Sequence, residues 1–158
     1  MFYLGCHLVD LIYRIQGRPL EIIPYNMSIG YEGVTGEDYG MALFKYPNGV
    51  SFIKTCAAEC GGFARRQLVI CGTKGTIEIN PLEAYSPEGG MYAAMRRAAA
   101  GDSVLNPSTA MKGERYNRYD GMMKNFVRMV RGEIKTSYTY EYELELYKLI
   151  LKSCGVPL

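Results

Sequence analysis

The single histidine of the 158-residue chain, His7, is its clearest candidate for acid–base chemistry. It stands in the segment FYLGCHLVDLI, where apolar residues recur at the three- and four-residue spacing of a helix. On such a helix Asp10 lies one turn after His7, where the two side chains can meet. A histidine at the edge of an apolar stripe, with a carboxylate nearby, is suited to exchange protons near neutral pH. The alternative interpretation is an ordinary His–Asp contact on a helix surface.

Two further polar side chains share the flank of this helix that carries His7. At about 100° per residue, Tyr3 and Arg14 fall on the same side as His7. We therefore treat His7 and Asp10 as candidate catalytic residues, and Tyr3 and Arg14 as candidate substrate-binding residues. The buried stripe of the helix is predicted to consist of Leu4, Leu8, Leu11 and Ile15.

The five cysteines do not form a metal or nucleophile motif. If Cys56 and Cys60 lie on an extended strand, four steps of about 3.3 Å separate them by roughly 13 Å, too far to share one ion. Cys6 and His7 are adjacent on a helix, so their side chains diverge by about 100° and cannot act as a thiol–base pair. An odd number of scattered cysteines favours reduced thiols and a cytoplasmic location.

Glycine-rich segments also fail to indicate a nucleotide site. The run CGTKGT at residues 71–76 resembles a phosphate loop, but such a loop leads into a helix, whereas this run leads into a strand. Gly30, Gly33 and Gly36 do not have the G-x-G-x-x-G spacing of a dinucleotide fingerprint. The residues alone therefore predict no cofactor site in this chain.

Composition restricts the class of protein. Hydrophobic residues make up 48% and charged residues 22% of the sequence, as in ordinary globular domains. A net charge of +2 without a basic block argues against a nucleic-acid partner. No apolar run approaches the roughly 20 residues that cross a bilayer, so we expect no membrane partner. The length suits one domain.

The elements that must position the histidine follow a simple order. The first helix is expected to stop at Gly17, two residues before Pro19. Strands are predicted over residues 21–32, 39–46, 50–57, 67–71 and 76–80. Asn48-Gly49 is a hairpin signal because it tolerates positive φ, and residues 72–75 are a second turn. Together they predict an antiparallel sheet of at least five strands.

The second half of the chain is predicted to be mainly loop and helix. Residues 82–118 are rich in Gly, Ala, Pro and Ser, and only MYAAMRRAAA has helical character; a loop of this length is usually functional. Asp120 is expected to cap a helix that ends at Gly132. A last helix over about residues 140–153 should bury Leu144, Tyr147 and Leu151. The fold class is therefore α+β: an open, mostly antiparallel sheet with helices packed on one face.

Four segments in this order resemble the C-terminal domain of the Gfo/Idh/MocA oxidoreductases, which include glucose–fructose oxidoreductase and inositol 2-dehydrogenase. They are LGCHLVDLI with GRP, YPNGVSFIKT, RRQLVICGTKGTIEI, and MMKNFVRMVRGE with TYEYELELYKLIL. The resemblance implies an NAD(P)-binding Rossmann domain in the parent enzyme, which acts on a sugar, a polyol or a related hydroxyl or carbonyl compound. It also implies that the open face of the sheet forms homo-oligomer contacts.

The resemblance assigns roles residue by residue. His7 matches the family's active-site histidine, which helps to handle the proton of the substrate hydroxyl, and Asp10 matches the acidic residue three positions later. Many members have Asp four positions before the histidine, where this chain has Tyr3. The family's glycine loop and its Glu-Lys-Pro lysine belong upstream of His7, which only six residues precede. We therefore expect residues 1–158 to be a single substrate and oligomerisation domain without the NAD(P)-binding domain.

Two functions remain open from the sequence. The first is a part of an NAD(P)-dependent oxidoreductase, inactive alone because it has no hydride carrier and binds no cofactor itself. In that case residues 82–119 would help to line the substrate site. The second is a non-catalytic dimerisation or ligand-binding module that uses the uncovered sheet face.

Overall fold

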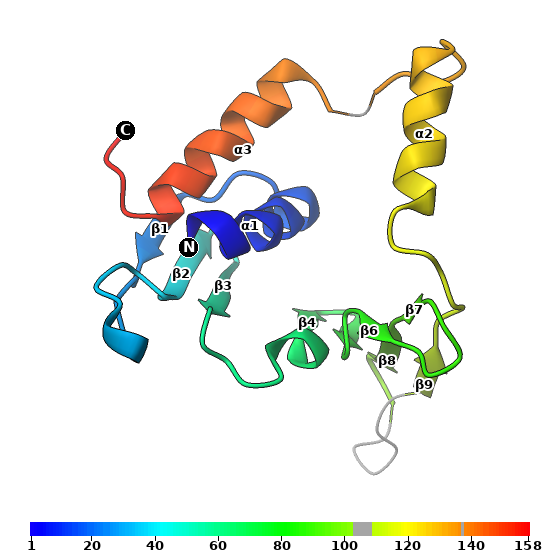
Figure 1. The fold of residues 1–158 in the computed structure, drawn as a ribbon, viewed down its shortest axis with the longest axis horizontal. Helices are drawn as coiled ribbons and strands as arrows, with labels where there is room; N and C mark the ends of the chain where they lie inside the picture. The colour runs from blue at the N-terminus through cyan, green and yellow to red at the C-terminus, as the bar shows by residue number, and fades with distance from the viewer. Residues whose placement is uncertain (103–108, 137) are drawn as a thin grey trace. The chain divides into compact units, whose positions relative to one another are not determined.

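The computed structural model describes residues 1–102, 109–136 and 138–158, and it divides them into two units (Figure 1). Unit 1 comprises Met1–Glu59 and Thr136–Leu158. Unit 2 comprises Cys60–Lys135. The two units are described separately below. The fold class is confirmed, because unit 1 packs helices on one face of an antiparallel sheet and every strand pair in the described residues is antiparallel.

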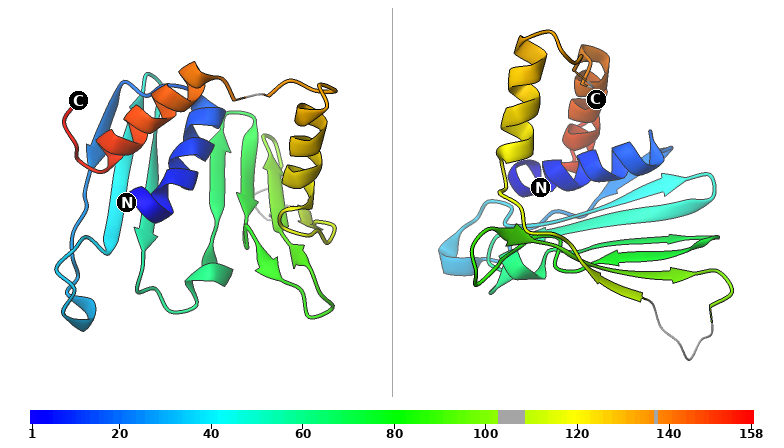
Figure 2. Two further views of the ribbon diagram at one scale, coloured as in Figure 1. Left: turned by 45° about the horizontal axis from the view of Figure 1, so that its top comes forward. Right: turned by 90° about the vertical axis from the view of Figure 1, so that its right-hand side faces the viewer.

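Unit 1 is a three-stranded sheet covered by two helices. Strands β1 (Glu21–Pro24), β2 (Tyr39–Tyr46) and β3 (Gly49–Cys56) are hydrogen-bonded in the order β1-β2-β3. Helices α1 (Phe2–Gln16) and α3 (Tyr140–Ser153) lie on the same face of this sheet (Figure 2). Because side chains alternate along a strand, one face of β2 and β3 meets the helices. The core there consists of Val9, Ile12, Ala42, Phe44, Ile53, Leu149 and Ile150.

The first helix and its end at Gly17 are confirmed, but its buried face differs from the prediction. The buried residues are Gly5, Val9 and Ile12, whereas Leu4 and Ile15 are exposed. Gly5 belongs to this buried face, and a Cβ on it would lie 3.7 Å from the Thr55 side chain of β3, an ordinary van der Waals distance. The helix therefore packs against the sheet through its smallest residue, which apolar periodicity does not reveal.

The last helix is also confirmed, but the residues that it buries in the core differ from those predicted. Leu149, Ile150 and Ser153 are buried, whereas the predicted Leu144 and Tyr147 are exposed. Ser153 is tolerated in the core because its hydroxyl donates to the Leu149 carbonyl at 2.8 Å.

The predicted strand at residues 21–32 is wrong beyond Pro24. The regular strand β1 ends there, but backbone hydrogen bonds to β2 continue beyond it. Tyr25 and Met41 exchange bonds of 2.7 and 3.2 Å, and Met27 and Tyr39 form an isolated bridge. The chain then forms a short 3₁₀ helix, η1 (Tyr31–Gly33). Gly30, which precedes it, has φ 71°, a left-handed value that favours glycine.

The hairpin between β2 and β3 is confirmed, although the expected reason for it is wrong. Tyr46 pairs with Gly49, which leaves Pro47 and Asn48 as the two turn residues. Neither Asn48 nor Gly49 has positive φ. Proline suits the second position of the commonest β-turn, because its φ is fixed near −65°.

Unit 2 contains the remaining strands in two sheets. Strands β4 (Leu68–Gly72), β5 (Gly75–Ile79), β8 (Ala94–Ala99) and β9 (Thr109–Lys112) form a four-stranded sheet in the order β4-β5-β8-β9. Strands β6 (Ala84–Tyr85) and β7 (Met91–Tyr92) form a small hairpin, and η2 (Gly62–Arg65) is a 3₁₀ turn. The second predicted hairpin, β4–β5, is confirmed. The predicted strands are thus spread over separate hydrogen-bonded ladders.

The expected helical character of MYAAMRRAAA is wrong. The segment forms β7 and β8, and β8 pairs with β5 on one side and with β9 on the other. Glu78 lies opposite Arg96 in this ladder, so opposite charges face each other across the strands. Pairing on both sides outweighs the intrinsic helix preference of alanine and arginine.

Helix α2 (Asp120–Val130) is confirmed, but its cap is not Asp120. Tyr119 occupies the N-cap position and forms no capping hydrogen bond through its side chain. Asp120 lies in the first turn, where it accepts a hydrogen bond from Asn117 at 3.0 Å. The chain leaves the helix near Gly132, whose φ is 73°.

Candidate functional site

The candidate residues on α1 lie on its exposed side, away from the core of unit 1. His7 and Arg14 are exposed, Asp10 is half-buried, and Tyr3 is 86% exposed. The helix positions these side chains firmly, because Val9 and Ile12 on its opposite side are buried against the sheet. The predicted grouping of the four residues on one flank therefore agrees with the structure, although the residues buried on the other side are Gly5, Val9 and Ile12 and not the predicted stripe.

Asp10 is bonded to residues other than His7. The Nε of Arg14 donates to Asp10 Oδ1 at 3.2 Å, and the hydroxyl of Tyr142 donates to the same oxygen. Among the residues that the structure describes, no hydrogen bond joins His7 to Asp10. Asp10 is instead tied to α3, a helix more than a hundred residues away in sequence.

An aromatic cluster surrounds this carboxylate. The rings of Tyr13 and Tyr142 are stacked with centroids 5.0 Å apart, and Tyr138 meets Tyr142 edge-on at 5.9 Å. The guanidinium carbon of Arg14 lies 4.6 Å from the centroid of the Tyr138 ring, a cation–π distance. Sequence analysis missed Tyr138 and Tyr142, because fourteen tyrosines give no signal that singles out two of them.

The cluster changes the acidity of two of its members. A hydrogen bond with Tyr142 raises the pKa of Arg14, and the charge of Asp10 raises it further. Burial raises the pKa of Tyr142, and its hydrogen bond to Asp10 acts in the same direction. At neutral pH Tyr142 is therefore a neutral phenol and Arg14 a guanidinium.

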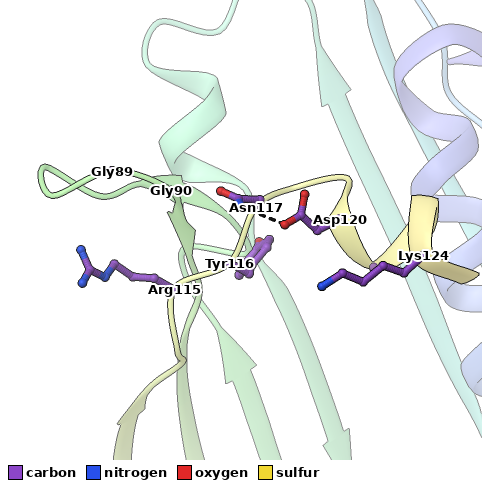
Figure 3. Close-up of a pocket in the computed structure, with 8 residues that line it drawn as sticks. Gly89, Gly90, Arg115, Tyr116, Asn117, Asp120 and Lys124 are labelled. Carbon is purple, nitrogen blue, oxygen red and sulfur yellow. Dashed lines mark hydrogen bonds between the residues drawn. The ribbon is translucent and has the colours of Figure 1, made fainter.

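A shallow pocket of about 470 Å³ lies in unit 2 (Figure 3). It includes five residues of the predicted functional loop at 82–119 and the first turns of α2; residues 103–108 of that loop lie outside the described residues. The cations at its rim are the exposed Arg115, which pairs with Glu88 at 3.7 Å, and Lys124. The lining residues are Gly89, Gly90, Arg115, Tyr116, Asn117, Asp120, Gly121 and Lys124. That this loop lines a substrate site stays a prediction.

The described residues do not fit a nicotinamide dinucleotide. Such a cofactor binds at a glycine-rich turn from a parallel strand into a helix, where amide groups at the helix N-terminus face the pyrophosphate. Gly72–Gly75 instead joins two antiparallel strands, and Gly30, Gly33 and Gly36 lie between β1 and β2. No step that uses the cofactor can be derived from these residues.

Other kinds of site find little support. Within the described ranges, no group of three or more His, Cys, Asp or Glu side chains is placed to hold a metal ion. All five cysteines are free thiols. In the part of the chain that the structure describes, every helix is too short or too polar to cross a membrane.

Comparison with known proteins identifies the first half of the chain by sequence. Residues 1–78 match the model of the GFO/IDH/MocA C-terminal domain. This segment includes α1 with His7 and Asp10, so the resemblance inferred from the motifs is confirmed. No curated protein matches the sequence.

Two crystal structures show the same fold over nearly the whole chain. One is described as a putative oxidoreductase from Klebsiella pneumoniae, with a TM-score of 0.71 and 15% identity. The other is described as a putative NADPH-dependent oxidoreductase from Desulfitobacterium hafniense, with a TM-score of 0.69 and 15% identity. Each match covers 96% of this chain and 45% or 44% of the other, so the chain spans less than half the length of these proteins.

Proposed function

We propose, from the premise that residues 1–78 belong to the GFO/IDH/MocA C-terminal domain family, that this chain forms the substrate side of an NAD(P)-dependent oxidoreductase. The substrate class is a sugar, a polyol or a related hydroxyl or carbonyl compound. The observation that carries the proposal is the exposed flank of α1, because His7 and Asp10 of the matched segment are both accessible there.

His7 has the role of acid and base in this proposal. Oxidation of an alcohol removes a proton from oxygen and a hydride from carbon, and the reverse reaction returns both. An exposed imidazole can take or return the proton. It cannot accept the hydride, which requires a nicotinamide. We propose that another domain of the parent enzyme binds this cofactor and that the chain alone is inactive.

Tyr3, Asp10 and Arg14 have binding roles on the same flank. Tyr3 is exposed and offers a phenolic hydroxyl, and Asp10 offers acceptor oxygens to substrate hydroxyl groups. Arg14 holds Asp10 through Nε, and its position over the Tyr138 ring restrains the guanidinium. Substrate specificity is expected to depend on these side chains, whereas proton transfer depends on His7.

Calorimetric titrations of the purified chain test the division of roles. We expect no heat of binding with NADH or NADPH, and saturable binding of a neutral polyol such as myo-inositol. His7→Gln keeps a polar side chain but removes the titratable group, and it should weaken polyol binding only modestly. Saturable binding of NADH would contradict the proposal, because it would require a cofactor site in this chain.

The uncovered face of the sheet in unit 1 supports a further part of the proposal, homo-oligomerisation. Ile23, Leu43 and Phe52 are cross-strand neighbours on the face opposite the helices, and Phe52 is 65% exposed. This partly exposed apolar row supports a protein–protein interface at this face. The same row would serve a non-catalytic dimerisation module, the alternative function, in which His7 binds no ligand.

Sedimentation equilibrium tests the oligomer. The wild-type chain is expected to associate, and Phe52→Lys should shift it to a monomer because a charge is costly to bury at an interface core. Val69→Lys, on the exposed side of β4, is the matched control and should leave association unchanged. A wild-type chain that stays monomeric at high concentration would exclude association through this face.

A further inference from the structure

We propose that Tyr142 is a positioning residue that orients the Asp10 carboxylate to accept a hydrogen bond from a substrate hydroxyl next to the one served by His7. The inference rests on the proposed function and extends the site from α1 to α3. Tyr142 itself does not touch the substrate; it acts through Asp10.

Both of the donors to Asp10 found among the described residues bond the same oxygen, which leaves the other without a partner there. Both the Tyr142 hydroxyl and Arg14 Nε donate to Oδ1. An ionised carboxylate has two oxygens and about four acceptor positions, so Oδ2 keeps its capacity for an incoming donor. The Asp10 side chain is 30% exposed, which gives a ligand access to it. Asp10 is thus held on one oxygen and available on the other.

Tyr142 is better fixed than Arg14, so it sets the orientation of the carboxylate. Its ring is stacked on Tyr13 and meets Tyr138 edge-on. Its backbone N–H donates to the Thr139 hydroxyl at 3.2 Å, which anchors the start of α3. Arg14, by contrast, is an exposed partner four residues away on the same helix, and such pairs contribute little.

The arrangement selects a class of ligand. An ionised carboxylate can only accept hydrogen bonds, so Oδ2 selects a hydroxyl or amine donor and disfavours a carboxylate or phosphate at this position. His7 and Asp10 are three residues apart on one helix, which places their Cβ atoms about 5–6 Å apart. Neighbouring hydroxyls of one molecule can therefore reach both side chains. The expected ligand is a neutral compound with two adjacent hydroxyl groups.

Tyr142→Phe in the full chain tests the inference, because it removes the hydroxyl and keeps the ring stack. The probe is myo-inositol, and binding is followed by the imidazole proton resonances of His7, the single histidine. We expect Tyr142→Phe to bind about tenfold more weakly, in line with the loss of a hydrogen bond to a charged group. Tyr138→Phe removes a hydroxyl from the same cluster that does not bond Asp10, and it should bind as the wild type does.

Two further variants separate positioning from a general loss of stability. Tyr46→Phe removes a hydrogen bond to the Gly17 carbonyl elsewhere in unit 1, so it should lower stability without changing affinity. Asp10→Ala and the double variant Asp10→Ala/Tyr142→Phe should bind equally weakly, because Tyr142 has no effect once its acceptor oxygen is gone.

The outcomes distinguish the inference from the function on which it rests. If the wild-type chain binds myo-inositol and Tyr142→Phe binds it equally well, the positioning role is wrong and the proposed function stands. If Tyr142→Phe weakens binding further in the Asp10→Ala background, Tyr142 does not act through Asp10. If the wild-type chain does not bind the polyol at all, the proposed function fails and the inference falls with it.

Discussion

The two units of this chain use the same kind of sheet but differ in what covers it. In unit 1, helices α1 and α3 cover one face, and Phe44 beneath them is 1% exposed. Among the described residues of unit 2 the buried side chains are Ala84, Ser86 and Met91, at the β6–β7 hairpin, and none of them belongs to the four-stranded sheet. The difference shows why a precise site is better built on α1 than on the pocket of unit 2: a helix with a buried face holds its exposed side chains in place.

The largest expected effect contrasts a buried phenylalanine with an exposed one. Phe44→Ala should lower the free energy of unfolding of unit 1 by about 3–5 kcal/mol, because it removes a fully buried ring and leaves a cavity. Phe126→Ala on α2, where Phe126 is 58% exposed, should cost no more than about 0.5 kcal/mol. Urea unfolding of both variants measures the two changes in the free energy of unfolding. Equal decreases would show that unit 1 is not stabilised by the helices that cover its sheet.

A smaller effect is expected in unit 2, from backbone geometry. Gly75 has φ 149°, and a Cβ there would lie 2.3 Å from the carbonyl oxygen of Ala98 on β8. Gly75→Ala should therefore cost about 2–3 kcal/mol and weaken the β5–β8 ladder. Gly72→Ala, at the other end of the turn, has 3.7 Å of clearance and is the matched control.

Amide hydrogen exchange locates the effect of Gly75→Ala. Protection should fall in β5 and β8 while α1 and α3 keep theirs, because the units have separate contacts. A uniform loss of protection across both units would mean that they unfold as one cooperative body and would remove the basis of the comparison.

A change of about 1 kcal/mol is expected at the start of α3. The hydroxyl of Thr139 accepts the N–H of Tyr142, and Thr139→Ala removes this cap. The pKa of Glu141 is lowered mainly by a hydrogen bond from its own backbone N–H and, to a smaller extent, by a hydrogen bond with the Thr139 side chain. Thr139→Ala removes the second bond, so the pKa of Glu141 should return part of the way to its ordinary value. A carboxyl group whose pKa is lowered by folding stabilises the folded state at pH values above its pKa in the unfolded chain, and this stabilisation is lost as the pH falls. The variant should therefore lose less stability on acidification than the wild type does. Thermal unfolding at several acidic pH values measures it.

Alkaline pH should affect unit 1 through three of its groups whose pKa values are raised by burial. Burial raises the pKa values of Tyr46, Tyr142 and Cys154, which ordinarily titrate at 10.0, 10.0 and 9.0. Each contributes stability that is complete below its unfolded pKa and is lost as pH rises through the folded value. Protection of α1 and α3 should therefore decline from about pH 9 upward. Tyr46→Phe should reduce this decline, and a decline that stays the same would contradict the assignment to Tyr46.

The sequence predicts local features of this fold better than tertiary ones. Alternating apolar and polar residues, together with turn signals, predict the β2–β3 and β4–β5 hairpins, because a hairpin is formed by segments that are neighbours in sequence. The buried face of α1 includes Gly5, a residue that apolar periodicity does not single out. MYAAMRRAAA forms strands because of partners elsewhere in the chain.

The candidate site follows the same rule. His7 and Asp10 could be predicted, because they share one helix and resemble a family motif. Tyr142 could not be predicted, because its bond to Asp10 spans 132 residues and exists only after α1 and α3 pack together. The missed part of the site is thus the part that depends on tertiary structure.

The most direct test of the account follows the imidazole resonances of His7 while the wild-type chain is titrated with myo-inositol. The account predicts saturable shifts of these resonances, with smaller changes in unit 2. No shift of His7 up to about 100 mM, far above the usual KM range of enzymes, would contradict the claim that the exposed flank of α1 is a substrate site.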